Sequence, residues 1–82
     1  MSGNVRELKM PRVGVAMTEG TIVRWLKNVG DRVEQNEILL EIATEKIEFE
    51  VPSPCNGTVV ELLAKENDVV QVLETIARIE EG

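Results

Sequence analysis

Two stretches of this chain match each other without a gap, and this internal repeat constrains the fold more than any other feature. A repeat at a fixed offset indicates one structural unit that is used twice. Two copies are too few for a solenoid. They predict two similar β units that pair about a pseudo-twofold axis, so that each covers the other's apolar face. The identical pairs are Gly20/Gly57, Thr21/Thr58, Leu26/Leu63, Asp31/Asp68, Val33/Val70, Glu37/Glu74 and Ile42/Ile79.

Alternating apolar and polar side chains predict short strands in both halves. No helical period extends beyond one turn, so we expect an all-β domain built as a flattened barrel or sandwich of two small antiparallel sheets. Gly20, Gly30 and Gly57 are the candidate structural-turn residues. Residues 11–20 form a loop that either packs on the surface or contacts a partner. The expected strands cover residues 5–10, 20–26, 38–44, 47–51 and 57–63.

Composition limits what such a domain can do. The 82 residues suffice for one small domain, and an aromatic content of 2% leaves Val, Ile and Leu to fill the core. The net charge of −6 argues against a nucleic-acid partner and favours a protein with a basic or mixed surface. The chain has no histidine and a single cysteine, Cys55, which argues against a self-sufficient enzyme, a disulfide and a metal site. No signal peptide or membrane-spanning apolar run is visible.

The stretch from residue 39 to residue 54 reads as a β-hairpin with Lys46 at or beside its tip. No Gly, Asn or Pro marks the tip, so turn chemistry gives limited support. An arbitrary lysine is usually one more solvated surface charge. The repeat adds that the equivalent position of the second half falls at the chain end, which would place the tip opposite the termini. That geometry suits a group that must visit other proteins. The side chains that alternate on the apolar side are Leu40, Ile42, Ile47, Phe49 and Val51.

Several motifs together resemble the lipoyl domain of 2-oxo acid dehydrogenase complexes, over nearly the whole chain from about residue 7 to residue 80. The resemblance implies a flattened β-barrel of two four-stranded antiparallel sheets, with lipoic acid in amide linkage to Lys46. Glycines of the family's second and fifth strands correspond to Gly20 and Gly57. The motifs are GTIVRWLK from Gly20, VGDRV from Val29, LLEIATEK ending at Lys46, EVPSP from Glu50, GTVVE from Gly57 and DVV from Asp68.

The resemblance also implies a non-catalytic carrier that works between enzymes. Its expected partners are a thiamine-diphosphate-dependent decarboxylase, an acyltransferase core and dihydrolipoamide dehydrogenase, together with a lipoate ligase or lipoyl transferase that attaches the cofactor. We expect a monomer comprising residues 1–82, alone or as part of a longer chain, with no nucleic-acid or membrane partner. The expected compartment is the bacterial cytoplasm, or the mitochondrial matrix in a eukaryote.

Residues beside the lysine are candidates for partner recognition, and some of them depart from the family's pattern. Glu45 stands where the family usually has Asp, and Ile47 stands where a small residue is usual. A glycine that is common in a late turn is replaced around Leu73. An acidic face that only keeps the hairpin soluble is the alternative to a recognition surface. The recognition candidates are Thr44, Glu45, Ile47, Glu41 and Glu48.

Three other functions stay open. A biotinyl carrier domain shares the fold, but its lysine is typically flanked by methionines, which are absent beside Lys46. The glycine cleavage carrier protein also bears lipoyl-lysine, yet it is usually longer and has helical segments. An unmodified β-barrel that only makes protein contacts is a third alternative, although such a module would have no reason to keep a lysine at the tip.

Overall fold

Two antiparallel sheets of four strands each make up the fold in a computed structural model that describes residues 4–82. One sheet has the strand order β1-β8-β6-β3 and the other has the order β5-β4-β2-β7. This described part of the chain contains no helix, and the all-β prediction is confirmed. The strands are β1 Val5–Lys9, β2 Glu19–Trp25, β3 Arg32–Val33, β4 Ile38–Ala43, β5 Glu48–Pro52, β6 Gly57–Leu62, β7 Val69–Gln71 and β8 Thr75–Glu81.

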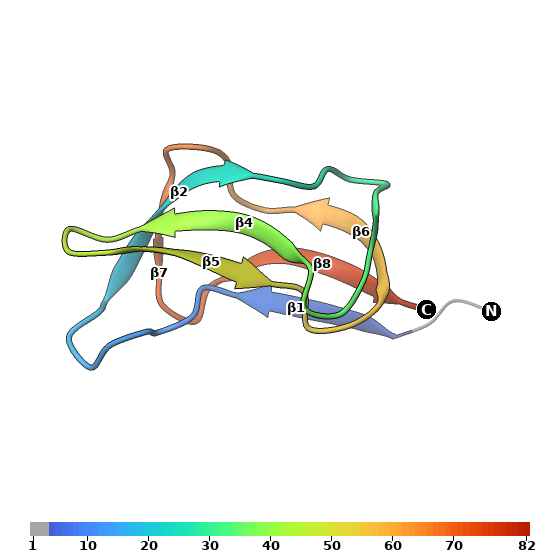
Figure 1. Cartoon of the computed structure of the whole chain (residues 1–82), viewed down its shortest axis with the longest axis horizontal. Coiled ribbons are helices and arrows are strands. Elements are labelled where there is room, and N and C mark those ends of the chain that lie inside the picture. Colours follow the sequence, from blue (N-terminus) through green and yellow to red (C-terminus); the bar gives the residue numbers. More distant parts are fainter. Residues whose placement is uncertain (1–3) are drawn as a thin grey trace.

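The two halves of the repeat have the same local structure and are interlocked. Strands β2, β3 and β4 of the first half correspond to β6, β7 and β8 of the second. The short strand of each half pairs with a strand of the other half: β3 of the first half pairs with β6, and β7 of the second half pairs with β2. Figure 1 shows the resulting elongated, two-layered molecule. The halves therefore exchange a strand as well as stacking face to face.

The acidic residues shared by the two repeats close equivalent turns. Asp31 and Asp68 each accept a hydrogen bond on a carboxylate oxygen from the backbone N–H three residues earlier, at 2.8 Å. Glu37 and Glu74 do the same at 3.0 Å. Such side-chain bonds satisfy backbone donors that a turn would otherwise leave unpaired. These four carboxylates thus stabilise the turns by accepting backbone hydrogen bonds.

Aliphatic side chains from both sheets form the core, as the low aromatic content predicted. Each fully buried aliphatic side chain contributes about 1.5–3 kcal/mol relative to exposure. Trp25 packs against this core, and its Nε1–H donates to the carbonyl oxygen of Ala64 at 2.9 Å. Cys55 is also buried, and burial raises the pKa of its thiol. The largest fully buried apolar residues are Met10, Ile22, Val33, Leu39, Leu40, Ile42, Ile76 and Ile79.

The three candidate turn glycines have different roles. Gly30 has a φ of 96° and lies in the turn between β2 and β3. Gly20 and Gly57 are in strands β2 and β6, so their assignment to turns needs correction. A Cβ on Gly20 would lie 2.8 Å from Cγ2 of Ile42, and one on Gly57 would overlap the carbonyl oxygen of Glu80. Close approach of the Glu80 backbone therefore requires glycine at position 57, whereas at position 20 neighbouring side chains would have to shift to admit a Cβ.

Leu73 carries a backbone conformation that glycine adopts more easily. Its φ is 75° and its side chain is 66% exposed. The left-handed backbone is therefore strained, and burial of the side chain offsets little of that strain. We expect Leu73→Gly to raise the free energy of unfolding by about 1 kcal/mol. This value is the backbone strain that glycine relieves, minus the larger conformational entropy that glycine loses on folding. Urea unfolding measures it. The symmetry-related Asn36, whose φ is 73°, is the control, because asparagine tolerates this conformation and Asn36→Gly should change little. Equal effects at both positions would contradict the strain argument.

Candidate cofactor-attachment site

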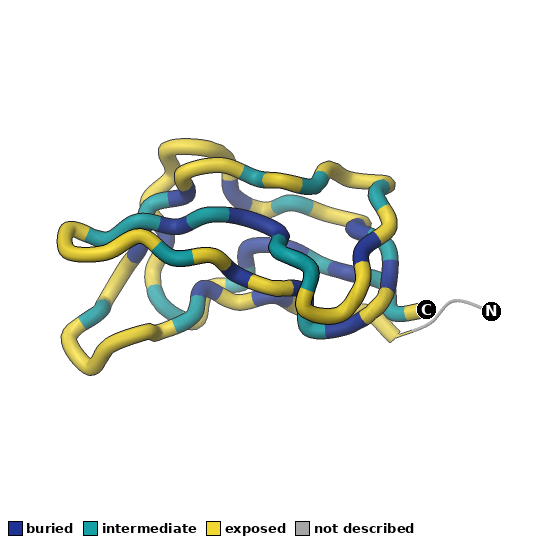
Figure 2. Tube along the Cα trace, viewed as in Figure 1, coloured by how far each residue is buried: buried dark blue, intermediate teal, exposed yellow. Residues whose placement is uncertain are grey.

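A four-residue turn, Thr44–Ile47, joins β4 to β5 and carries Lys46 as its third residue. The ladder between the two strands continues up to the pair Ala43 and Glu48, immediately before and after the turn. In Figure 1 this hairpin projects at one end of the molecule, where the loop between β1 and β2 also projects. Figure 2 shows that the tip is exposed, and Lys46 is among its exposed residues.

The turn is held by the side chain of Thr44 rather than by glycine, proline or asparagine. The backbone N–H of Thr44 donates to the carbonyl oxygen of Ile47 at 2.8 Å. Its hydroxyl donates to the same oxygen at 3.3 Å and accepts from the N–H groups of Lys46 and Ile47 at 3.3 and 3.1 Å. Threonine is known to stabilise turns in this way. The absence of the usual turn residues at the tip is thereby explained.

The other lysines occupy different environments. Lys27 donates to the Glu37 carboxylate at 2.7 Å, and this hydrogen bond raises the pKa of its ammonium group. Lys9 lies on β1 and Lys65 lies in the turn after β6, both exposed. Only Lys46 is placed on a projecting hairpin. Position, rather than exposure alone, distinguishes Lys46 from the other three lysines.

The structure separates the five recognition candidates into three groups. Glu45, Ile47 and Glu48 lie exposed at the tip or at the first residue of β5. Thr44 is at the tip too, but its hydroxyl is used within the turn. Glu41 lies farther back on β4, where its carboxylate pairs with Arg24 of β2 at 3.2 Å.

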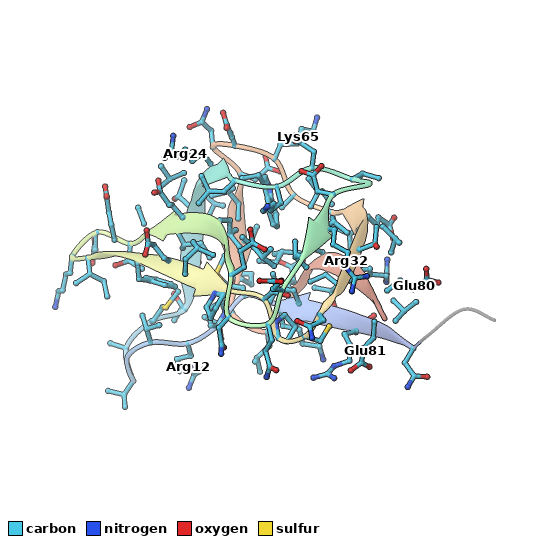
Figure 3. The ribbon with its side chains drawn as sticks, turned by 45° about the vertical axis from the view of Figure 1, so that its right-hand side comes forward. Arg12, Arg24, Arg32, Lys65, Glu80 and Glu81 are labelled. Carbon is cyan, nitrogen blue, oxygen red and sulfur yellow. The ribbon has the colours of Figure 1, made fainter. Side chains whose placement is uncertain are left out.

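A second exposed segment lies at the same end of the molecule as the hairpin. Figure 1 shows the loop between β1 and β2 reaching this end, whereas the C-terminus lies at the opposite one. Val15 on this loop is 98% exposed. Figure 3 shows Glu80 and Glu81 at the end away from the hairpin. The tip and the chain end are thus separated along the long axis, as the repeat predicted.

The described residues do not assemble a conventional catalytic centre. Among residues 4–82, no three His, Cys, Asp or Glu side chains are placed to hold a metal ion. The burial that raises the pKa of Cys55 also hides its thiol from a substrate. Over the same residues, no helix is long and apolar enough to cross a membrane. What the site offers is an exposed primary amine on a hydrogen-bonded hairpin.

Comparison with known proteins identifies this class of domain. The family described as "Biotin-requiring enzyme" matches residues 6–79. The dihydrolipoyllysine-residue acetyltransferase component of the pyruvate dehydrogenase complex of Corynebacterium glutamicum is 53% identical over 95% of this chain and 12% of its own length. The succinyltransferase component of the 2-oxoglutarate dehydrogenase complex of Staphylococcus saprophyticus is 46% identical over 93% of this chain and 18% of its own length.

Solved structures give the same fold. The lipoyl domain of the 2-oxoglutarate dehydrogenase complex from Azotobacter vinelandii superposes with a TM-score of 0.77 and 29% identity, over 93% of this chain and 96% of that domain. Urea carboxylase of Kluyveromyces lactis also gives a TM-score of 0.77, with 25% identity over 93% of this chain and 6% of that enzyme.

The fold and the exposed hairpin lysine define a carrier domain, in which an attached group rather than the protein performs the chemistry. The chain belongs to the biotin/lipoyl family and is similar to the lipoyl domains of 2-oxo acid dehydrogenase complexes. It spans less than a fifth of the curated relatives given above, since it covers 12% and 18% of their lengths.

Proposed function

We propose that Lys46 carries lipoic acid and that the chain serves as the lipoyl domain of the acyltransferase component of a 2-oxo acid dehydrogenase complex. The observation that carries this proposal is the exposed amine at the tip of the β4–β5 hairpin. Support comes from relatives at 53% and 46% identity whose names describe dihydrolipoyllysine residues.

The residues of the tip suit covalent attachment of a long carboxylic acid. The Nζ atom of Lys46 can attack the activated carbonyl carbon of an acyl adenylate, forming an amide and releasing AMP and a proton. The flexible four-carbon stem of lysine lengthens the arm, and the amide cancels its charge. When bound, the lipoyl group would supply acyl transfer and reversible thiol–disulfide chemistry. The chain itself holds the base of the arm in place through the ladder of β4 and β5.

The partners follow from that role. A decarboxylase that uses thiamine diphosphate would acylate the domain, an acyltransferase core would pass the acyl group to coenzyme A, and dihydrolipoamide dehydrogenase would reoxidise the arm. All three would approach the end of the barrel that carries Lys46. Tethering the domain to such a complex raises its effective concentration at each active site to about the millimolar range.

Reductive acylation of the lipoylated domain tests this function. We would incubate it separately with decarboxylase components that use pyruvate, 2-oxoglutarate and branched-chain 2-oxo acids, and measure its intact mass. An acyl increment with one of them is the expected result and identifies the complex. The positive control is the lipoyl domain of the Corynebacterium glutamicum acetyltransferase. Acylation of the control by its decarboxylase, without acylation of this domain by any of the three, would contradict the proposal.

The acidic residues at the tip should affect the acylation step selectively. Glu45 is exposed beside Lys46, so its charge meets any decarboxylase that approaches the arm. We expect Glu45→Gln and Glu48→Gln to lower kcat/KM for reductive acylation by about threefold to tenfold at low salt, because charges at an interface mainly affect association. Glu41→Gln is the matched control, since that carboxylate is already paired with Arg24 and lies away from the tip. Equal rates of acylation for all three variants and the parent would contradict a role in recognition. The acidic face would then serve only to keep the hairpin soluble.

The rival function is that of a biotinyl carrier. The specific observation in its favour is the likeness to urea carboxylase, which matches the fold as well as the lipoyl domain does. Against it stand Glu45 and Ile47, which occupy the positions where biotinyl carriers typically have methionines. A modification assay with both cofactors separates the two functions.

A further inference from the structure

We infer that Thr44 is a positioning residue whose hydroxyl holds Lys46 in the conformation that the modifying enzyme and the decarboxylase accept. This inference rests on the proposed function. It assigns Thr44 a role inside the turn in place of the direct contact with a partner that the sequence suggested.

The hydrogen-bonding capacity of the Thr44 hydroxyl is fully used within the turn. A hydroxyl has one donor and two acceptor lone pairs. Here the hydroxyl donates to the carbonyl oxygen of Ile47 and accepts from the backbone N–H groups of Lys46 and Ile47. No capacity is left for a hydrogen bond to a partner protein. Thr44 therefore acts on recognition through the backbone of the two residues that follow Glu45.

The turn also depends on these bonds more than most hairpin tips do. Tight hairpins usually rely on glycine, asparagine or aspartate, which adopt a positive φ at low cost. None of these residues occurs among Thr44–Ile47, and no residue of the tip has a positive φ. Apart from the Thr44 N–H to Ile47 carbonyl bond, the interactions recorded within the turn come from the Thr44 hydroxyl. Its loss should let the tip sample other conformations.

The strand geometry and the shape of the side chain limit where the Thr44 hydroxyl can lie. Side chains alternate along β4, so Thr44 continues the side of Leu40 and Ile42, whose side chains are buried in the core. Glu45 and Lys46 then follow with exposed side chains. The β-branched Thr44 has restricted χ1 freedom, which keeps the hydroxyl in place at a low entropic cost. The arm thus starts from a defined backbone direction.

The test compares Thr44→Val, which keeps the shape but removes the hydroxyl, with Thr44→Ser, which keeps the hydroxyl. We expect Thr44→Val to slow both lipoylation by lipoate ligase and reductive acylation about tenfold, because only a fraction of molecules then presents the competent turn. Thr44→Ser should restore both rates to within about twofold of the parent. Thr44→Ala removes the hydroxyl with less apolar volume and replaces Thr44→Val if that variant does not fold.

A second measurement does not depend on the cofactor. Amide hydrogen exchange at Lys46 and Ile47 of the unmodified domain should accelerate about tenfold in Thr44→Val and return towards the parent rate in Thr44→Ser, because the hydroxyl is the acceptor for both amides. Thr75→Val is the matched control, since its hydroxyl bonds to Glu7 at 3.4 Å on the other sheet and its loss should leave the tip unchanged.

Each outcome bears on the inference. Parent-like rates and exchange in Thr44→Val would overturn it. Slow modification in both Thr44→Val and Thr44→Ser, with exchange unchanged, would also overturn it and favour a direct contact of a partner protein with both the hydroxyl and the methyl group of Thr44. A parent domain that accepts no lipoate would refute the proposed function instead, and the exchange data would still decide whether the hydroxyl orders the turn.

Discussion

Replacement of Lys46 by arginine should abolish lipoylation completely while the fold and its stability stay unchanged. Arginine keeps the positive charge and much of the length, but its guanidinium group is always protonated and cannot form the amide. The side chain is exposed on a hairpin tip, so the substitution removes no core contact, and the free energy of unfolding should change by less than about 0.5 kcal/mol. Intact mass after incubation with lipoate, ATP and lipoate ligase measures the modification, and urea unfolding measures the stability.

Lys65→Arg is the matched control for this prediction. Lys65 is exposed as well, and it lies in the turn after β6, away from the hairpin (Figure 3). This variant should be lipoylated at the parent rate. Lipoylation that persists in Lys46→Arg would show that the attachment site lies elsewhere, and unfolding of Lys46→Arg would contradict the placement of this side chain at an exposed tip.

Replacement of Gly57 by alanine should destabilise the domain strongly. A Cβ at this position would overlap the backbone carbonyl oxygen of Glu80 in the neighbouring strand β8. Backbone cannot move aside as a flexible side chain can, so β6 and β8 would have to separate at this end of the sheet. We expect a loss of about 3 kcal/mol or more, a large part of the roughly 5–15 kcal/mol that stabilises a typical domain. Urea unfolding gives the difference between variant and parent.

Gly20, the residue equivalent to Gly57 in the other repeat, provides a control for this prediction. A Cβ on Gly20 would meet side chains rather than backbone, at 2.8 Å from Cγ2 of Ile42 and 3.2 Å from Sδ of Met10. Side chains yield more readily than backbone, although the buried Ile42 is stiff, so Gly20→Ala should cost less than Gly57→Ala, about 1–2 kcal/mol. A further control is Gly14→Ala, because a Cβ there would have no neighbour within 4 Å. Equal losses for Gly20→Ala and Gly57→Ala would contradict the steric argument.

The repeat makes most of the fold predictable from the sequence. The strands that could not be predicted are the shortest ones. The longer strands carry enough alternating residues to be located from the sequence. Strand β3 has only two residues, Arg32 and Val33, so no period can be read from it. Its pairing with β6 depends on long-range packing. For that reason the exchange of β3 and β7 between the sheets was not predicted.

One pair of symmetry-related ion pairs cannot be recognised by comparing the two repeats for identical residues. Arg24 pairs with Glu41 at 3.2 Å, and at the corresponding place in the other sheet Glu61 pairs with Arg78 at 2.6 Å. The signs are reversed, so a comparison by identity misses the correspondence. Both pairs follow a register shift in the ladder, which brings these positions opposite each other. Such a bulge cannot be read from the alternation alone, so the sequence does not reveal that Glu41 is paired with Arg24 away from the tip.

The candidate site was predictable in position but not in detail. Alternation on both sides of Glu45 and Lys46 places the tip correctly without any typical turn residue. The role of Thr44 inside the turn does not follow from the alternation of side chains, which shows only that this residue lies beside the tip. A threonine at the start of a four-residue turn without glycine is the signal that could have revealed it. The loop between β1 and β2 reaches the same end only through the three-dimensional arrangement of the sheets.

The most direct test of the account is to locate the modification on the parent domain. The domain is incubated with lipoate, ATP and a lipoate ligase and, in parallel, with biotin, ATP and a biotin ligase; intact mass and peptide mapping follow. The account predicts one lipoyl increment, confined to the peptide that contains Lys46, and no biotin. Biotin on Lys46 without lipoate would make the domain a carboxylase carrier. Lipoate on Lys9, Lys27 or Lys65, or no addition from either ligase, would contradict the assignment of the β4–β5 hairpin as the attachment site.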